Sequence, residues 1–185
     1  LTGDNNANVL TGGAGDDTLN LGTDGMADTV VFTDGNGGDT INGFEQGSDV
    51  LDFTNTTVQG TLAKNQVTND GTDSSFPLDD ANGTVNVIDT DADDILGGGT
   101  NSVSPIVDFT NTTQVAAFLD NGVTTSDDAG ETHFFVINDG DNAGDAFVYR
   151  FDDAGGDAAV DAGELSLIGT VNADAVLTSA ADIVV

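Results

Sequence analysis

Hydrophobic residues recur at regular intervals in the first fifty residues. Large aliphatic side chains stand at positions 10, 19, 30, 41 and 51, which are separated by 9, 11, 11 and 10 residues. An acidic or amide residue stands two positions before each of them, at 8, 17, 28, 39 and 49. Because side chains on a β-strand alternate between its two faces, each aliphatic residue is expected to point inward from a short strand. The matched spacing of the two columns predicts a series of turn–strand repeats.

One copy of the repeat is complete. The segment Gly12–Asn20 reads GGAGDDTLN and fits every position of the nonapeptide G-G-x-G-x-D-x-U-x, in which U is a large aliphatic residue. The glycines suit a tight turn with positive φ, and the aspartate at the end of the turn supplies a carboxylate. The copy before it, Gly3–Thr11, carries Asn8 in place of the acid, and the 11-residue steps indicate insertions in later turns.

This series of repeats resembles the RTX family of secreted bacterial proteins over residues 1–53. The resemblance implies a short parallel β-roll in which turns from alternate repeats lie on one edge and share calcium ions. It pairs Asn8 with Asp28, Asp17 with Asp39, and Asp28 with Asp49. The calcium ligands expected in this part of the chain are Asn8, Gly13, Gly15, Asp17, Asp28, Gly37, Asp39 and Asp49. Phe44 and Phe53 either cover the open end of the roll or belong to an ordinary core.

The middle of the chain, residues 54–132, predicts short strands between loops rich in Gly, Asn, Asp and Ser. The strands are expected near 57–62, 84–89 and 106–109. One helix is expected over 113–120, with Thr112 or Thr113 as its N-cap.

Two further features of this region leave alternatives open. The hexapeptide DFTNTT occurs at 52–57 and again at 108–113, and it marks either two related structural units or a turn used twice. The acidic cluster at 89–94 is either a solvated loop or a further cation site.

The C-terminal third predicts three strands, over 133–137, 146–151 and 164–171. The segment between the last two aligns with the twelve-residue calcium loop of an EF-hand. Its expected ligands are Asp153, Asp157, Ala159 through its carbonyl, Asp161 and the bidentate Glu164. Gly155 and Ala158 depart from the EF-hand pattern, and the flanks are strands, so the expectation is an EF-hand-like loop within a sheet. Asp139, Asp141 and Asp145 form a weaker candidate site.

The last six residues, 180–185, place an acid before a short apolar end. They are similar to the uncleaved C-terminal signals of proteins exported by bacterial type I secretion. The same residues also fit a final edge strand, and the two interpretations are compatible.

Composition narrows the possible functions. The chain has 33 acidic residues against 2 basic ones, a formal charge of −31, no Cys and 37% hydrophobic residues. Such a charge speaks against binding to nucleic acid or an anionic membrane, while the apolar content is too high for a disordered acidic tail. Without Cys there are no disulfides or zinc–thiolate sites, and no apolar run is long enough for a transmembrane segment. The charge opposes compaction unless cations bind; a salt-tolerant acidic surface is the alternative.

The sequence therefore predicts an all-β protein with two domains, a calcium-binding β-roll over 1–53 and a β-sandwich-like domain over 54–185. With a single His and no catalytic motif, it is not expected to be an enzyme. It begins inside a repeat and without Met, which suggests the C-terminal part of a longer protein.

The expected function is that of a secreted module of the bacterial cell surface that folds on binding Ca²⁺ and supports assembly of a surface layer (S-layer). Its partners would be calcium ions, further copies or other surface-layer subunits, and the type I secretion machinery during export. The alternative is an export and folding module attached to a secreted enzyme, toxin or adhesin.

Overall fold

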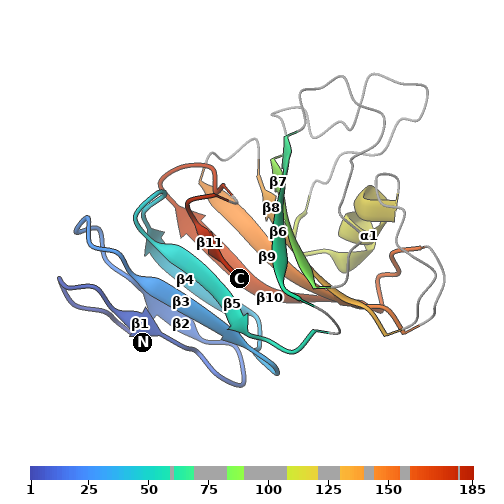
Figure 1. The fold of residues 1–185 in the computed structure, drawn as a ribbon, viewed down its shortest axis with the longest axis horizontal. Helices are drawn as coiled ribbons and strands as arrows, with labels where there is room; N and C mark the ends of the chain where they lie inside the picture. The colour runs from blue at the N-terminus through green and yellow to red at the C-terminus, as the bar shows by residue number, and fades with distance from the viewer. Residues whose placement is uncertain are drawn as a thin grey trace.

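The protein is all-β apart from one helix in the part that the structure describes. The computed structural model describes residues 1–58, 61–68, 83–89, 108–120, 130–139, 144–154, 159–178 and 180–185. In chain order the elements are β1 (Val9–Leu10), β2 (Thr18–Asn20), β3 (Thr29–Thr33), β4 (Asp39–Phe44), β5 (Val50–Asn55), β6 (Ala63–Thr68), β7 (Thr84–Asp89), α1 (Thr112–Asp120), β8 (Thr132–Asn138), β9 (Asp145–Asp152), β10 (Leu165–Ala173) and β11 (Ile183–Val184). The predicted all-β fold class is confirmed (Figure 1).

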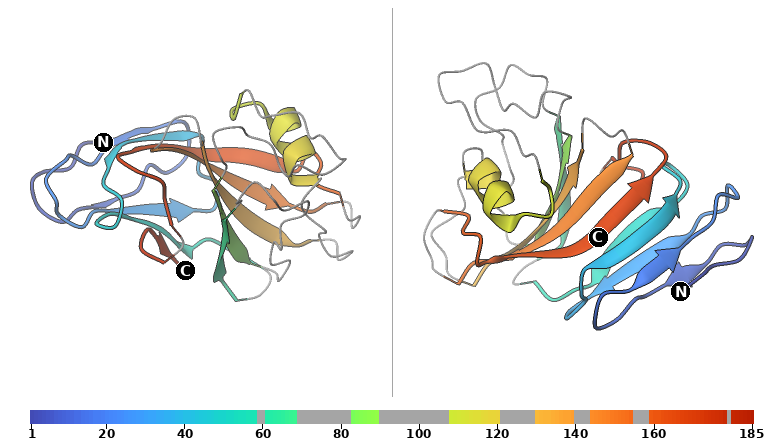
Figure 2. Two further views of the ribbon diagram at one scale, coloured as in Figure 1. Left: turned by 90° about the horizontal axis from the view of Figure 1, so that it is seen from above. Right: turned by 180° about the vertical axis from the view of Figure 1, so that it is seen from behind.

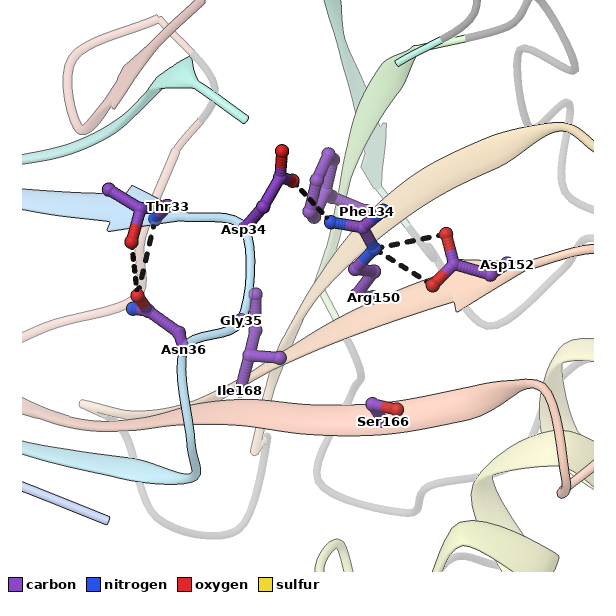
Figure 3. A pocket seen from close by; sticks show the side chains of 9 residues that line it. All are labelled: Thr33, Asp34, Gly35, Asn36, Phe134, Arg150, Asp152, Ser166 and Ile168. Carbon is purple, nitrogen blue, oxygen red and sulfur yellow. Dashed lines mark hydrogen bonds and ion pairs between the residues drawn. The ribbon is translucent and has the colours of Figure 1, made fainter. Parts of the chain in front are cut away.

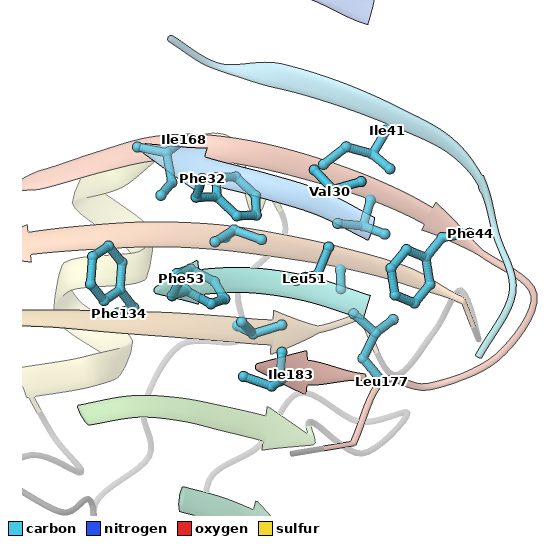
Figure 4. Packing of buried hydrophobic residues seen from close by; sticks show 14 of the residues in the cluster. Val30, Phe32, Ile41, Phe44, Leu51, Phe53, Phe134, Ile168, Leu177 and Ile183 are labelled. Atoms are coloured by element: carbon cyan, nitrogen blue, oxygen red, sulfur yellow. The ribbon is translucent and has the colours of Figure 1, made fainter. Parts of the chain in front are cut away.

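The first five strands alternate between two sheets. Strands β1, β3 and β5 are parallel neighbours in a four-stranded sheet, and β2 and β4 are parallel neighbours in a seven-stranded sheet. The aliphatic column is buried, as the spacing predicts: Leu10 is 7% exposed, and Leu19, Val30, Ile41 and Leu51 are at most 1% exposed. Each turn between consecutive strands therefore carries the chain from one sheet to the other, over a shared apolar interior (Figure 4).

The C-terminal strands extend both of these sheets. Strand β10 pairs in parallel with β4, and β11 pairs in parallel with β5. An amide ladder crosses the first junction, because Asn172 Nδ2 donates to Asn42 Oδ1 at 2.7 Å and Asn42 Nδ2 donates to Asn20 Oδ1 at 3.0 Å. Strands on the two sides of residue 53 thus share sheets and one hydrophobic core (Figure 1).

Two apolar cores lie on opposite faces of the larger sheet. Alternate residues of β8 contribute to each: Phe134 and Val136 to the core beneath the four-stranded sheet, and Phe135 and Ile137 to the core beneath α1. All seven residues of β8 are buried for this reason. Figure 2 shows α1 on one side of the large sheet, with the four-stranded sheet on the other.

Several predicted elements match the structure. Strand β7 has the predicted bounds, and β8 and β9 form the predicted antiparallel hairpin. Strand β10 begins one residue later than expected and ends two residues later. The helix begins at Thr112, but its N-cap is Asn111, whose Oδ1 accepts hydrogen bonds from the Thr113 and Gln114 N–H groups. The N-cap prediction was therefore wrong by one residue, because the amide of Asn111 reaches both N–H groups.

The strand predicted over 57–62 is absent from its described residues, 57–58 and 61–62, and the strand begins at Ala63 instead. The Thr57 N–H donates to both carboxylate oxygens of Asp34, at 3.0 and 3.1 Å, which holds this segment in a turn. Of the strand predicted over 106–109, residues 106–107 lie outside the described part, while Asp108 and Phe109 are not in a strand.

The repeated hexapeptide forms a similar turn in both places. The Asp52 carboxylate accepts a hydrogen bond from the Thr54 N–H at 2.8 Å, and the Asp108 carboxylate accepts one from the Thr110 N–H at 2.9 Å. One copy begins within β5 and continues past its end, and the other runs into the first turn of α1. The shared sequence therefore encodes an Asx-turn, which favours the turn interpretation over related structural units.

We expect Phe53→Ala to lower the free energy of unfolding by about 3–5 kcal/mol, the usual cost of removing a buried aromatic ring. Phe53 is fully buried, stacks on Phe32 at a centroid distance of 5.0 Å and contacts Phe134 at 5.1 Å. Urea unfolding in Ca²⁺ measures the change, with Val9→Ala as the control because Val9 is 74% exposed. Equal effects of the two substitutions would contradict this description of the core.

Candidate metal sites

The structure brings together the residue pairs expected on the edges of the N-terminal repeats. The Asn8 N–H donates to Asp28 Oδ1 at 2.8 Å, and the Asp28 N–H donates to Asp49 Oδ1 at 2.9 Å. On the opposite edge, the Asp17 N–H donates to Asp39 Oδ1 at 3.0 Å. Residues 20 to 22 positions apart in the sequence are thus neighbours on successive turns. We call these five residues the acidic column.

Three carboxylates of the acidic column are buried. Asp28, Asp39 and Asp49 are 2%, 2% and 1% exposed. Desolvation raises the pKa of Asp39 and of Asp49 above the usual value, and the negative charge of neighbouring acids adds to the effect in both cases. A buried carboxylate that keeps its charge needs a cation or strong hydrogen-bond donors nearby.

The two basic side chains of the protein contact other groups. Lys64 Nζ donates to the Ile183 carbonyl at 3.0 Å, and Arg150 forms ion pairs with Asp34 and Asp152. In the described part of the chain, the carboxylates of Asp28, Asp39 and Asp49 accept hydrogen bonds from backbone N–H groups and form no ion pair with a basic side chain.

Glycines let successive turns lie close together beside Asp39. Gly15 has φ +95°, a conformation that residues with a side chain rarely adopt. A Cβ atom on Gly37 would lie 2.3 Å from the Gly15 carbonyl carbon, and a Cβ atom on Gly12 would lie 2.4 Å from Asp39 Oδ2. The turns that hold Gly13, Gly15 and Gly37 are thus packed against each other, with backbone carbonyls beside a carboxylate.

The C-terminal segment continues one edge of the acidic column. The sequence pattern did not predict this contact. Asp182 is fully buried; its Oδ1 accepts a hydrogen bond from the Gly47 N–H at 2.7 Å, and its backbone carbonyl accepts one from the Leu51 N–H at 2.7 Å. The following strand, β11, is an edge strand, so the edge-strand interpretation of the last residues is confirmed. The available signal was that two aliphatic residues follow Asp182, as Val50 and Leu51 follow Asp49.

Two more carboxylates on this edge were not predicted as site residues. Glu45 Oε2 accepts hydrogen bonds from the Asp24 N–H at 3.0 Å and the Gly25 N–H at 2.7 Å. Asp174 Oδ1 accepts a hydrogen bond from the Gln46 N–H at 2.7 Å. The rarity of Glu in this chain was the signal that could have drawn attention to Glu45.

The EF-hand-like loop joins the ends of β9 and β10. Asp153 is 3% exposed, and Glu164 lies beside it, because Glu164 Oε1 accepts a hydrogen bond from the Ala154 N–H at 2.9 Å. The Glu164 N–H donates to the Asp161 carbonyl at 3.0 Å. Ala159 is half-buried and Asp161 is exposed. Asp157 lies outside the described residues, as do Asp141 of the weaker site and residues 90–94 of the acidic cluster.

Glu131, the residue before β8, is hydrogen-bonded to this loop through its backbone. The Asp153 N–H donates to the Glu131 carbonyl at 2.9 Å, and the Gly130 N–H donates to the Asp153 carbonyl at 2.7 Å. The Glu131 side chain is 7% exposed, and its Oε2 lies 3.4 Å from Nε2 of the buried His133. Besides the buried Asp153, the loop therefore adjoins a second buried acid, which sequence spacing could not indicate.

Within the described residues, no three His, Asp or Glu side chains converge closely enough to hold a metal ion by themselves. A calcium ion at either candidate site would therefore combine one or two carboxylates with backbone carbonyls and water, all of which Ca²⁺ accepts as ligands. No helix in the described part is long and apolar enough to cross a membrane.

Searches against protein-family models, curated proteins and solved structures give no match for this chain.

We expect the metal-free protein to be more stable at about pH 5 than at about pH 8. The pKa of Asp39 and of Asp49 is raised from 3.8 in the folded state, so folding takes up protons as the pH falls through those raised values. Their contribution to stability is complete below about 3.8 and is lost as the pH rises through the folded pKa. Urea unfolding in EDTA at the two pH values measures this difference.

Asp49→Asn should flatten this pH profile, because it removes one of the linked groups. Asp34, whose pKa is lowered by hydrogen bonds from the side chain and backbone of Thr57 and by Arg150, acts in the opposite sense. Its contribution to stability is lost as the pH falls below 3.8. If the metal-free protein is more stable at pH 8 than at pH 5, the charged carboxylates of the acidic column do not destabilise it and this interpretation is wrong.

Proposed function

We propose that this chain is an extracellular calcium-binding module, that its first strands form a parallel β-roll, and that it folds when Ca²⁺ binds to the acidic column. The observation that carries the proposal is the burial of Asp28, Asp39 and Asp49 on the two edges of the repeats, each next to the equivalent residue of another turn. The first five strands alternate between two sheets and pair in parallel within each of them, which supports the β-roll.

Calcium fits these turns better than other common metals do. Ca²⁺ takes 6–8 oxygen ligands from carboxylates, backbone carbonyls and water in flexible geometry. The turns supply those groups, whereas zinc favours Cys and His ligands and the chain has no Cys and one His. The resemblance of Gly12–Asn20 to RTX repeats points to the same ion.

Binding of Ca²⁺ would couple to folding through the charge of the chain. A formal charge of −31 opposes compaction, and the unfolded chain does not hold the paired turns together. A ligand that binds only the folded state stabilises it in proportion to the logarithm of its concentration. Sites of the affinity found in extracellular modules, with Kd of about 10⁻⁴–10⁻³ M, would fill outside the cell and stay empty inside it.

The same coupling suits export by type I secretion followed by folding at the bacterial cell surface. The chain would leave the cell unfolded, carrying the C-terminal segment that is similar to type I signals, and Asp182 and Ile183 would become buried only on folding. Support of a surface layer is the function that we favour, with no catalytic role. The rival is an export and folding module for an upstream enzyme, toxin or adhesin.

We expect Asp39→Asn to have opposite effects in EDTA and in Ca²⁺. In EDTA at about pH 8 the variant should be more stable than the parent protein, because asparagine keeps the hydrogen bond from the Asp17 N–H and removes a buried charge. In Ca²⁺ it should be less stable and bind the ion about tenfold or more weakly, because one anionic ligand is lost. Calorimetric titration of EDTA-treated protein with Ca²⁺, followed by circular dichroism, measures both effects.

Asp52→Asn is the matched control for this experiment. It removes the same charge from β5, outside the acidic column, and asparagine can keep the Asx-turn to Thr54. Glu164→Gln should remove a separate binding step that belongs to the EF-hand-like loop. Full strand content in EDTA with no heat of Ca²⁺ binding would overturn the proposal.

Self-association distinguishes the two proposed roles. A surface-layer module should increase in mass when Ca²⁺ is added, because bridging ions reduce the repulsion between strongly acidic copies. Light scattering during size-exclusion chromatography, in EDTA and in Ca²⁺, measures the mass. A monomer that folds in Ca²⁺ without associating would favour the export module.

A further inference from the structure

A pocket of about 290 Å³ lies where the N-terminal repeats meet the C-terminal strands. One wall is the turn between β3 and β4, and the other walls are β8, β9 and β10. The pocket is lined by Thr33, Asp34, Gly35, Asn36, Phe134, Arg150, Asp152, Ser166 and Ile168 (Figure 3). It belongs to neither of the candidate calcium sites.

The pocket contains Arg150, the single arginine of the protein. Arg150 Nη1 donates to Asp34 Oδ1 at 2.7 Å, and Arg150 Nε donates to Asp152 at 2.8 and 3.0 Å. The guanidinium carbon lies 5.9 Å from the centre of the Phe134 ring. Figure 3 shows the guanidinium between the two carboxylates. These contacts fix the orientation of the guanidinium plane in the pocket.

The pocket presents both donors and acceptors to a ligand. A guanidinium has five N–H donors and a carboxylate accepts about four hydrogen bonds, so the contacts within this group leave capacity on both sides. The side chains of Asp34 and Asp152 are 44% and 53% exposed, so this polar group reaches solvent. Ser166, which is exposed, adds a hydroxyl group.

The charges in the pocket select against ionic ligands. Two carboxylates and one guanidinium leave a net charge of −1, on a protein of formal charge −31, so an anion is repelled. A cation would meet the fixed positive charge of Arg150 at the centre of the group. The ligand class that remains is neutral, and the donors and acceptors of Arg150, Asp34 and Asp152 suit a molecule with several hydroxyl groups.

The pocket also has an apolar part. Ile168 is 6% exposed and Phe134 is fully buried, and both line it beside the polar group. A sugar ring likewise has a polar part and an apolar part, because its hydroxyl groups lie at the edge of the ring and its C–H groups on the face. The volume is at the small end of ligand pockets, which suits one ring.

We propose that this pocket binds one neutral sugar ring, with adjacent hydroxyl groups bonded to the Asp34–Arg150–Asp152 group and the C–H face against Ile168. The protein would thus bind a neutral glycan as well as calcium. This inference does not depend on the proposed calcium function, because none of the residues that would contact the sugar belongs to the acidic column or the EF-hand-like loop.

The test uses the folded protein in Ca²⁺, with circular dichroism as the check on folding. Methyl glycosides of glucose, galactose, mannose, rhamnose and N-acetylglucosamine are titrated while protein NMR shifts are followed, and galacturonic acid serves as the charged comparison. We expect saturable binding of at least one neutral sugar with Kd of about 1 mM, the range of a few hydrogen bonds in an open pocket. Galacturonic acid should bind at least about tenfold more weakly.

Three variants locate the binding site. Ser166→Trp fills the pocket from an exposed position of β10 and should weaken sugar binding at least about tenfold. Thr18→Trp makes the same change at an exposed position of β2 outside the pocket lining and should leave the affinity unchanged. Arg150→Lys keeps the charge but loses the planar donor fork, and it should weaken binding in a protein that still folds.

Failure of every neutral sugar to bind would overturn the proposal, as would binding that Ser166→Trp leaves intact. Tighter binding of galacturonic acid than of the neutral sugars would overturn the ligand class. None of these results depends on calcium affinity, which is measured separately through Asp39→Asn.

Discussion

The burial of carboxylates in a protein with almost no basic side chains is the constraint on which the rest of the structure depends. Among the residues that the structure describes, the buried acids are Asp28, Asp39, Asp49, Glu131, Asp153 and Asp182. Burial of a charged group is costly unless hydrogen bonds or a counter-charge replace its water. In the acidic column, backbone N–H groups of the adjoining turn supply the hydrogen bonds, and they hold one repeat against another. The calcium proposal rests on this imbalance, because the protein itself has too few positive charges to neutralise these carboxylates.

Each of the two basic residues joins segments that are far apart in the sequence. Arg150, from β9, binds Asp34 in the turn after β3, and Lys64, from β6, binds the Ile183 carbonyl of β11 beside β5. Lys64 also places a charge next to the edge strand β11, where charged groups discourage pairing with other chains. The few positive charges therefore lie where segments distant in the sequence meet, and one of them creates the polar pocket.

Much of the N-terminal part could be predicted because its contacts repeat at the period of the sequence. One repeat occupies one turn and one strand. Residues at equivalent positions of the repeats therefore become neighbours in space, and the period alone predicts their contacts. The pairs Asn8–Asp28 and Asp17–Asp39 were found in this way. The helix and the β8–β9 hairpin were predicted for a similar reason, since their patterns are local.

The sequence by itself determined the all-β class, the register of the repeats and the excess of acidic charge. Only the tertiary structure decided that β10 lies against β4, that Asp182 continues the acidic column, that Glu131 faces Asp153 and that Arg150 meets Asp34. Two of these contacts join residues 116 and 135 positions apart and follow no period. These contacts depend on which apolar faces pack together in the folded chain. A pattern along the sequence does not predict which segments become neighbours when those segments do not repeat.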